Sequence, residues 1–241
     1  MAKNLASIGT ALFLTLAATP VSAASLQVSP VSLEIAAPNS AAIVTLNNPS
    51  AKPLKAQMRV FRWSIVNGEE HLEPATDVVA SPPIATLQPH TDYTVRVVKL
   101  SKQPVAVEET YRLMVDEIPD PSGRVSGTIA MAFRYSIPVF FMPEGPQKAD
   151  LTWSVSRRGG KVFISAVNSG NRRVRIADLA AADGKGKSVS VAKGLAGYVL
   201  ARSSKSWVAP RGFQTVSSPL LITAQGDIGP INAQAIPEAA R

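Results

Sequence analysis

The sequence predicts an all-β protein of two sandwich-like domains, and two observations lead to this prediction. Short alternating or β-branched runs recur along the 241 residues, separated by clusters of Pro, Gly, Asn and Asp, and no amphipathic helix follows the first residues. A hydrophobic content of 46% with 17% charged residues excludes a disordered chain. The length suits two domains of ordinary size, each with its own core.

Residues 1–23 are predicted to be an export signal. Lys3 supplies a positive start, Leu5 to Ala18 an apolar segment, and Val21-Ser22-Ala23 a small-residue cleavage site before Ala24. No later stretch approaches the roughly 20 apolar residues of a membrane-spanning helix. We therefore expect cleavage near Ala23/Ala24 and a periplasmic protein that is not an integral membrane protein. Because the chain contains no cysteine, its core must hold it together without disulfides.

Residues 24–143 are predicted to form an immunoglobulin-like β-sandwich, since about seven short strands over roughly 120 residues is the count typical of that fold. The Asn-Gly pair in Val66 to Glu69 predicts a hairpin turn, and Ser81-Pro82-Pro83 an extended connection. The predicted strands are Leu26 to Leu33, Ala42 to Asn47, Ala56 to Val66, Tyr93 to Leu100, Thr110 to Glu117 and Thr128 to Phe141.

A proline-rich linker, Met142 to Pro146, precedes a second predicted β-sandwich, residues 147–241. Asn168 to Asn171 and Asp183 to Gly186 are its clearest turns, and the tail from Asn232 is expected to be frayed. Its predicted strands are Leu151 to Ser156, Lys161 to Val167, Val174 to Leu179, Gly197 to Leu200, Ser206 to Val208 and Leu220 to Ala224.

The strand predicted from Thr128 to Phe141 carries a long apolar row on every second position. Alternation places this row on one face of a single strand, with small or polar residues on the other face. Such a strand can be an ordinary core strand, or it can offer its row to another protein. The row consists of Ile129, Met131, Phe133, Tyr135 and Ile137.

The sequence predicts neither an enzyme, nor a metal site, nor a cofactor. The two histidines, His71 and His90, have no partner at ligand spacing, and Gly159-Gly160 and Gly184 to Gly186 fit hairpin turns better than phosphate loops. The chain places 14 of its 25 basic and 5 of its 17 acidic residues at or after Lys148. We interpret this excess of basic residues as a solvated basic surface and expect no nucleic-acid partner. A protein that binds nucleic acid or anionic lipid through these basic residues is a further hypothesis, beside the two given at the end of this section.

Five motifs occur in order along the chain: Gln57 to Trp63, Ser81 to Ile84, Tyr93 to Val98, Tyr111 to Pro119 and Tyr135 to Phe141. Together they resemble the periplasmic chaperones of chaperone-usher pili, most closely their archaic or alternative branch. The resemblance covers the chain from about Leu26, strongly as far as Pro143 and more loosely beyond it. It implies two immunoglobulin-like domains in a boomerang arrangement.

In that family the chaperone lends a strand to an incomplete pilin sandwich, which is donor-strand complementation. The resemblance makes the strand from Thr128 to Phe141 the lending strand. Ile129, Met131 and Phe133 match the donor positions, and Tyr135 and Ile137 extend the row. The expected partners are therefore pilin or fimbrial subunits and an outer-membrane usher.

The better-known branch of the family anchors the subunit's terminal carboxylate with an arginine in the first strand and a lysine late in the donor strand. This chain has Pro30 and Pro138 at the matching positions, so that pair is absent. A buried carboxylate needs a charge-assisted donor, and Arg112 and Arg134 are the two candidates. Arg112 begins the strand expected to pair with the end of the donor strand, near the hinge, whereas Arg134 lies on the donor strand itself.

The resemblance also implies an interdomain charge network of Arg96, Glu117 and Asp227 that fixes the angle between the domains. The leading hypothesis is thus a periplasmic chaperone for pilus or fimbrium biogenesis. The alternative is a fimbrial structural subunit or another exported immunoglobulin-like binding protein. The sequence does not identify the pilin, the usher or the oligomeric state of the free protein.

Overall fold

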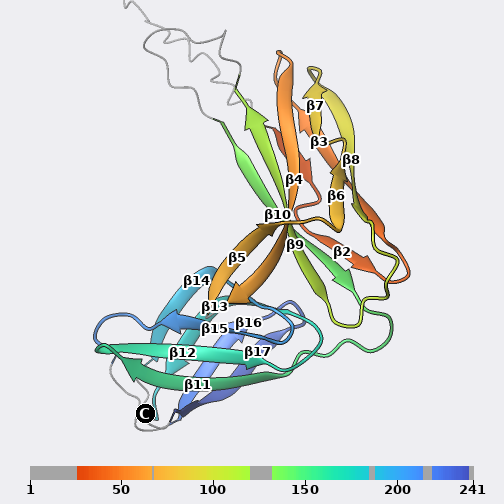
Figure 1. Ribbon diagram of the computed structural model, residues 1–241. Coiled ribbons are helices and arrows are strands. Elements are labelled where there is room, and N and C mark those ends of the chain that lie inside the picture. Colours follow the sequence, from red (N-terminus) through yellow and green to blue (C-terminus); the bar gives the residue numbers. More distant parts are fainter. Residues whose placement is uncertain (1–25, 67, 120–131, 185–187, 214–218, 239–241) are drawn as a thin grey trace, which may run out of the picture.

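The computed structural model describes residues 26–66, 68–119, 132–184, 188–213 and 219–238. Every regular element among these residues is a β-strand, so the all-β prediction is confirmed. Within them, no helix has the length and apolar character needed to cross a membrane. Figure 1 shows two lobes set at an angle: the N-terminal lobe, strands β1 to β10, and the C-terminal lobe, strands β11 to β17.

The N-terminal lobe is a sandwich of two sheets. One sheet has the order β1 (Gln27–Ser29), β3 (Ala41–Asn48), β8 (Thr91–Lys99) and β6 (Val78–Ser81). The other has the order β2 (Leu33–Ala36), β10 (Arg134–Met142), β9 (Glu109–Ile118), β4 (Leu54–Val66) and β5 (Glu69–Pro74), with β7 (Ile84–Leu87) beside β4. Alternate side chains of both sheets point inward, among them Leu46, Val95 and Leu113, which are fully buried. Each such side chain contributes about 1.5–3 kcal/mol to folding.

The first predicted strand, Leu26 to Leu33, is in fact two short strands in different sheets. β1 pairs antiparallel with β3, and β2 pairs parallel with β10 in the opposite sheet. Pro30 lies between them, and because proline has no N–H it cannot continue a central ladder. The chain therefore crosses from one layer to the other at this point.

The predicted hairpin after Val66 is confirmed, but its second strand has no apolar alternation. β5 pairs antiparallel with β4 from Val66 opposite Glu69, and Gly68 has a φ of +83°. Every residue of β5 is exposed, so sequence periodicity gave no sign of it. The hairpin reaches from the N-terminal lobe toward the C-terminal lobe (Figure 1).

The C-terminal lobe is built from a single seven-stranded sheet that curls around its own core. Its order is β14 (Ser188–Val199), β13 (Val174–Ala182), β16 (Leu220–Gln225), β17 (Pro230–Pro237), β11 (Leu151–Arg158), β12 (Lys161–Asn168) and β15 (Ser203–Val208). The end strands meet where Trp207 Nε1 of β15 donates to the Ala196 carbonyl of β14 at 2.9 Å. Trp207 also stacks on Trp153 with ring centroids 5.7 Å apart. This closure encloses the core without disulfides.

The expectation of a frayed tail from Asn232 is wrong for the described residues. β17 lies between β16 and β11, and Ala235 is fully buried. Its one fully buried residue is an alanine, and Ile231 and Ala233 are only partly buried, so the apolar signal in the sequence is weak. Two neighbouring strands supply the hydrogen bonds that hold it.

The linker between the lobes is fixed by the turn that joins β12 and β13. The backbone of Lys148 and the side chain and backbone of Asn171 exchange hydrogen bonds of 2.8 and 2.9 Å. Asn171 Nδ2 also donates to the Pro146 carbonyl at 3.2 Å. Gly170 lets the two segments approach, because a Cβ there would lie 2.2 Å from the Lys148 carbonyl oxygen. The linker is thus held to the C-terminal lobe by a hydrogen-bonded clasp.

Gly170→Ala should destabilise the protein by about 1–3 kcal/mol, because the added methyl overlaps backbone that cannot move without breaking the clasp. Chemical denaturation measures the loss. Gly184→Ala is the matched control, since a Cβ at Gly184 meets nothing within 4 Å. Equal stability of the two variants would contradict the role given to Gly170.

Candidate functional site

Strand β10 has an open backbone edge along its first half. It pairs with β9 from Arg134 to Phe141, but with β2 only from Val139 onward. The Glu117 N–H donates to the Phe133 carbonyl at 3.0 Å, so in this antiparallel ladder the backbone groups of Arg134, Ser136 and Pro138 face away from β9. Pro138 has no N–H to donate there. Between Arg134 and Pro138, the described residues leave this edge without a pairing strand, and an edge of this kind can accept another chain.

The apolar row of β10 passes from the core into solvent along the strand. Ile137 is buried in the core of the N-terminal lobe, and Tyr135 is half-buried with its hydroxyl donating to the Leu26 carbonyl. Phe133 is 37% exposed. Two predicted members of the row, Ile129 and Met131, lie outside the described residues. Where described, the row therefore offers apolar surface at the end of β10 away from the linker.

Arg134 lies at that same end and is engaged by an acidic neighbour. Its Nε donates to Asp116, which also accepts from Arg59 at 2.5 Å. Burial of Asp116 opposes its ionisation, but the hydrogen bonds from Arg134 and Arg59 outweigh this effect and lower the pKa of Asp116. Arg134 is therefore an exposed member of a surface ion-pair cluster.

Arg112 lies where the two lobes meet. It stands opposite Pro138 in the β9–β10 register, and its guanidinium lies 3.7 Å from the centroid of the Trp63 ring. Its side chain is only 15% exposed, and its nearest carboxylate is Glu70, at 3.6 Å. Burial lowers the pKa of Arg112, against the opposing influence of Glu70 and Tyr198. A largely buried cation is thus held beside the point where the open edge of β10 ends.

Aromatic side chains from both lobes surround this point. Trp63 and Phe140 of the N-terminal lobe pack with Leu200 of the C-terminal lobe. Tyr198 contacts the Trp63 ring edge-on at 5.4 Å and the Phe140 ring at 5.9 Å. The lobes therefore share a small apolar core.

A buried ion-pair cluster joins the lobes beside Phe140. Arg173, 3% exposed, donates from its backbone N–H and from Nη1 to Glu108 at 3.0 and 2.5 Å, and from Nη2 to Glu34. The Arg173 guanidinium lies 3.4 Å from the centroid of the Phe140 ring. Burial raises the pKa of Glu108 more strongly than Arg173 lowers it. These contacts bind Arg173 of the C-terminal lobe to two carboxylates of the N-terminal lobe, Glu34 on β2 and Glu108 just before β9.

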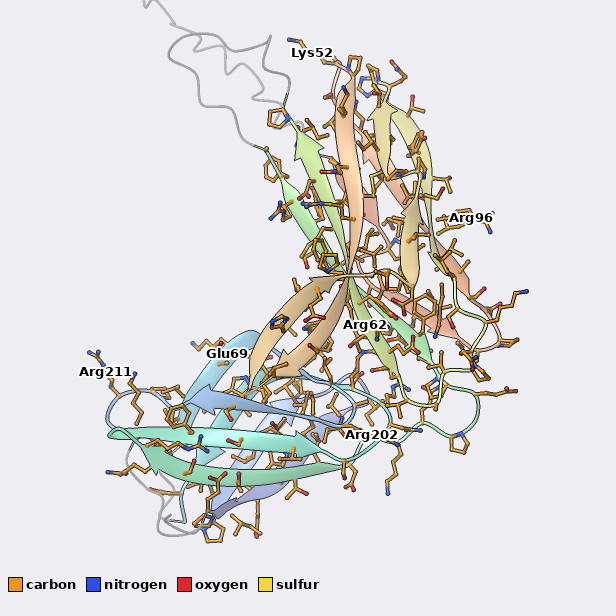
Figure 2. The ribbon with its side chains drawn as sticks, viewed as in Figure 1. Lys52, Arg62, Glu69, Arg96, Arg202 and Arg211 are labelled. Carbon is orange, nitrogen blue, oxygen red and sulfur yellow. The ribbon has the colours of Figure 1, made fainter. Side chains whose placement is uncertain are left out.

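The residues predicted for the interdomain network lie elsewhere. Arg96 is exposed on the outer face of β8 (Figure 2), Glu117 lies on β9 with a buried Oε2 that has no hydrogen-bond partner, and Asp227 lies in the β16–β17 turn. None of the ion pairs among the described residues joins these three. Sequence reasoning missed Arg173 and Glu108, and the only available signal was the adjacent like charges of Arg172-Arg173 and Glu108-Glu109.

The described residues contain no group of three or more His, Asp and Glu side chains that could hold a metal ion. His71 lies 3.7 Å from Glu73, and both side chains are exposed. The arrangement on β10 instead suits binding through backbone hydrogen bonds and apolar side chains. Its chemistry is that of a strand edge with a cation at one end.

Comparison with known families assigns this two-lobed β-fold to a class of assembly chaperones. A family model described as pili and flagellar-assembly chaperone, PapD N-terminal domain, matches residues 25–147, about half of the 241-residue chain. The chain belongs to this family. Membership favours the chaperone hypothesis over the fimbrial-subunit alternative.

Solved structures share the fold across both lobes. A chain of the CsuC–CsuE chaperone–tip adhesion subunit pre-assembly complex, from archaic Csu pili of Acinetobacter baumannii, is 24% identical with a TM-score of 0.72, covering 90% of this chain and 100% of that chain. The E. coli chaperone DraB is 20% identical with a TM-score of 0.60, and the match covers 88% of this chain and 97% of DraB. A chain of the Salmonella enterica SafA pilin–SafB chaperone complex is 16% identical with a TM-score of 0.61, and the match covers 88% of this chain and 96% of that chain. These matches confirm the predicted fold class. No curated protein matches the chain in sequence.

Arg173→Met should lower the free energy of unfolding by about 3 kcal/mol at pH 7, because Glu108 is left buried without its cation. Loss of the cation raises the pKa of Glu108 further, so the folded state binds the proton more tightly than the unfolded state. The loss in free energy of unfolding should therefore be smallest below pH 4.5, which is the ordinary pKa of this carboxyl. It should grow as the pH rises above that value.

Denaturant unfolding at several pH values measures this dependence. The matched control is Arg172→Met, because Arg172 is 3.8 Å from Glu34 and more exposed than Arg173. A loss of stability for Arg173→Met that does not change with pH would contradict the pairing of the Glu108 carboxyl with Arg173.

Proposed function

We propose that this protein is a periplasmic chaperone that binds pilin subunits by donor-strand complementation and delivers them to an outer-membrane usher for pilus or fimbria assembly. The observation that carries the proposal is the open edge of β10 with Phe133 exposed beside it. Family membership supports it. The relatives' complexes with a tip adhesion subunit and with a pilin are consistent with such a partner.

Strand lending needs both backbone donors and apolar side chains, and β10 supplies each. The N–H groups of Arg134 and Ser136 face the open edge and can pair with an incoming strand. Among the described members of the row, Phe133 and the exposed part of Tyr135 have surface left to bury, whereas Ile137 is already buried. At about 1.5–3 kcal/mol for each large side chain, burial of Phe133 and of any further exposed members drives binding. Ile129 and Met131 remain proposed contacts of this kind.

An incoming chain also needs an anchor for its terminal carboxylate. Arg112 is the better candidate, because it is largely buried and adjoins the end of the open edge at Pro138. Arg134 stands at the opposite end of β10 and is already paired with Asp116. We therefore assign the anchor to Arg112. A charge-assisted bond to a carboxylate in this setting fixes the register of the bound chain as well as adding affinity.

Export and delivery complete the proposal. The signal peptide, residues 1–23, is proposed to be removed near Ala23/Ala24, leaving domains of residues 24–143 and 147–241 in the periplasm. Subunits held on β10 would be passed there to the usher. Co-purification from periplasmic extract of a pilin subunit with this chain, lost on deletion of the subunit gene, tests the central claim.

Phe133→Asp should weaken subunit binding by at least about 30-fold, because a charge replaces an apolar side chain that must enter the subunit's groove. The fold should be retained, since Phe133 is already partly exposed. Affinity for the purified subunit and subunit levels in the periplasm both measure the effect.

Ser136→Asp is the matched control for this variant. It introduces the same charge three residues farther along the chain, within β10, but on the face opposite the apolar row. If the two variants weaken binding equally, or if Phe133→Asp leaves binding unchanged, the assignment of the row as the contact face is wrong.

A further inference from the structure

The C-terminal lobe carries an excess of positive charge that the contact between the lobes accounts for only in part. Residues from Lys148 onward include 14 basic and 5 acidic residues, whereas those before it include 11 basic and 12 acidic residues. Arg172, Arg173 and Lys205 each lie 3.8 Å or less from a carboxylate of the N-terminal lobe. The charge of these three is balanced across the contact, so the excess that needs another explanation lies elsewhere on the lobe.

Exposed cations gather at the end of the C-terminal lobe away from the linker. β11 begins just after the linker and ends at Arg158, and a two-glycine turn returns the chain as β12, which begins at Lys161. The Ala209 N–H donates to the Val162 carbonyl at 2.9 Å, so the loop that contains Arg211 starts beside the first turn of β12. Figure 2 labels Arg211 at this end of the lobe. Arg158, Lys161 and Arg211 are all exposed, and together they are called the basic tip.

The basic tip holds its charges in an arrangement that lowers stability. Arg158 and Lys161 stand directly opposite each other in the β11–β12 ladder, and like charges at such positions repel. Arg158 has a carboxylate partner, Glu238, at 3.4 Å. Among the residues that the structure describes, no carboxylate forms an ion pair with Lys161 or Arg211. The local excess of positive charge therefore calls for a negatively charged partner outside the chain.

Apolar surface adjoins these cations. Val208 of β15 is 48% exposed and stands opposite Phe163 of β12 on the outer face of the sheet. Phe163 is partly buried, and the Arg158 guanidinium lies 5.6 Å from the centroid of its ring. A surface that combines cations with an exposed aliphatic side chain fits the boundary between phospholipid headgroups and acyl chains.

The same features argue against a nucleic-acid partner at the tip. A base needs an exposed aromatic face on which to stack, and the ring of Phe163 already lies against Arg158. The three cations come from a hairpin and a separate loop, and they frame no pocket with a fixed spacing for phosphates. A fluid array of lipid headgroups can adjust to such cations, because each lipid moves independently of its neighbours.

We propose that the basic tip is a docking surface for anionic phospholipid membranes, with headgroup phosphates at Arg158, Lys161 and Arg211 and with Val208 at the apolar boundary. The eight residues of β11 separate the tip from the linker by about 25 Å at the usual rise of a strand. A membrane bound at the tip therefore leaves the open edge of β10, in the other lobe, uncovered. The inference goes beyond the proposed function and does not depend on subunit binding.

Binding of the chain from Ala24 onward to extruded vesicles, measured by co-sedimentation, tests the proposal. The protein should bind vesicles of equal parts phosphatidylglycerol and phosphatidylcholine, and it should not bind vesicles of phosphatidylcholine alone. Salt at about 1 M should release it, because the Debye length then falls to about 3 Å. Equal binding to the two kinds of vesicle, or binding that persists in this salt, would overturn the proposal.

Lys161→Gln and Arg211→Gln should each weaken binding to the anionic vesicles about fivefold, the effect of removing one cation near such a surface. A triple variant that adds Arg158→Gln should weaken binding by more than about 25-fold on the same scale. All three side chains are exposed, so thermal unfolding should show that the variants remain folded. A folded triple variant that binds as the unchanged protein does would show that the tip is not the docking surface.

The matched control removes the same number of charges away from the tip. Lys52→Gln, Arg96→Gln and Arg202→Gln are combined in one chain, and Figure 2 labels these exposed residues at a distance from Arg211. Both triple variants have the same net charge, but the control should bind the anionic vesicles as the unchanged protein does. If the control loses as much binding as the tip variant, net charge and not the tip drives the association, and the proposal is wrong.

A duplex DNA oligonucleotide at the same ionic strength tests the competing partner. If the unchanged protein binds the duplex more tightly than the anionic vesicles, and the tip variant loses that binding, the tip is a nucleic-acid site and the lipid assignment is wrong. Subunit binding by the tip variant should equal that of the unchanged protein. Failure of the vesicle experiment therefore leaves the proposed function intact, and failure of subunit binding leaves the membrane contact intact.

Discussion

The alternation of side chains along β10 is the constraint on which the rest of the structure depends. One face of this strand supplies Ile137, Val139 and Phe141 to the core of the N-terminal lobe, and the other supplies Phe140 to the contact between the lobes. The same strand pairs on one side with β9 and leaves half of its other side open. Because side chains alternate with a period of two, a slip of one residue would exchange these roles. The core therefore holds the open edge in register.

The contact between the lobes depends on cations that lie against aromatic rings. Arg173 covers Phe140 and Arg112 covers Trp63, and each guanidinium also faces a carboxylate. An aromatic face lowers the cost of burying a cation, and the carboxylates supply the hydrogen bonds that apolar neighbours cannot. Such contacts are directional, so they orient the lobes as well as holding them together. The hydrogen-bonded linker limits the remaining movement.

Periodicity in the sequence predicted the strands whose alternate residues fill a core, such as β4, β8, β9, β12 and β13. It could not reveal β5, whose residues are all exposed, or β17, whose buried positions are small, because pairing with neighbours holds both strands. The apolar row and Arg112 were predicted as site residues from the resemblance and from strand pairing. The contact of Arg173 with Glu108 spans 65 positions in the chain, so no local pattern encodes it. The end of the open edge likewise depends on β2, which begins only after Pro30.

Pro138 limits how far an added strand can pair along the open edge of β10. A strand added along β10 finds N–H donors at Arg134 and Ser136, and the next outward position, Pro138, has none. An incoming chain that extended one step farther would meet a missing donor and then the occupied edge at Val139. Only a chain that terminates before this point leaves none of its own acceptors unpaired. In the proposed mode of binding, the imide nitrogen of Pro138 would favour the end of a polypeptide over its middle at this position.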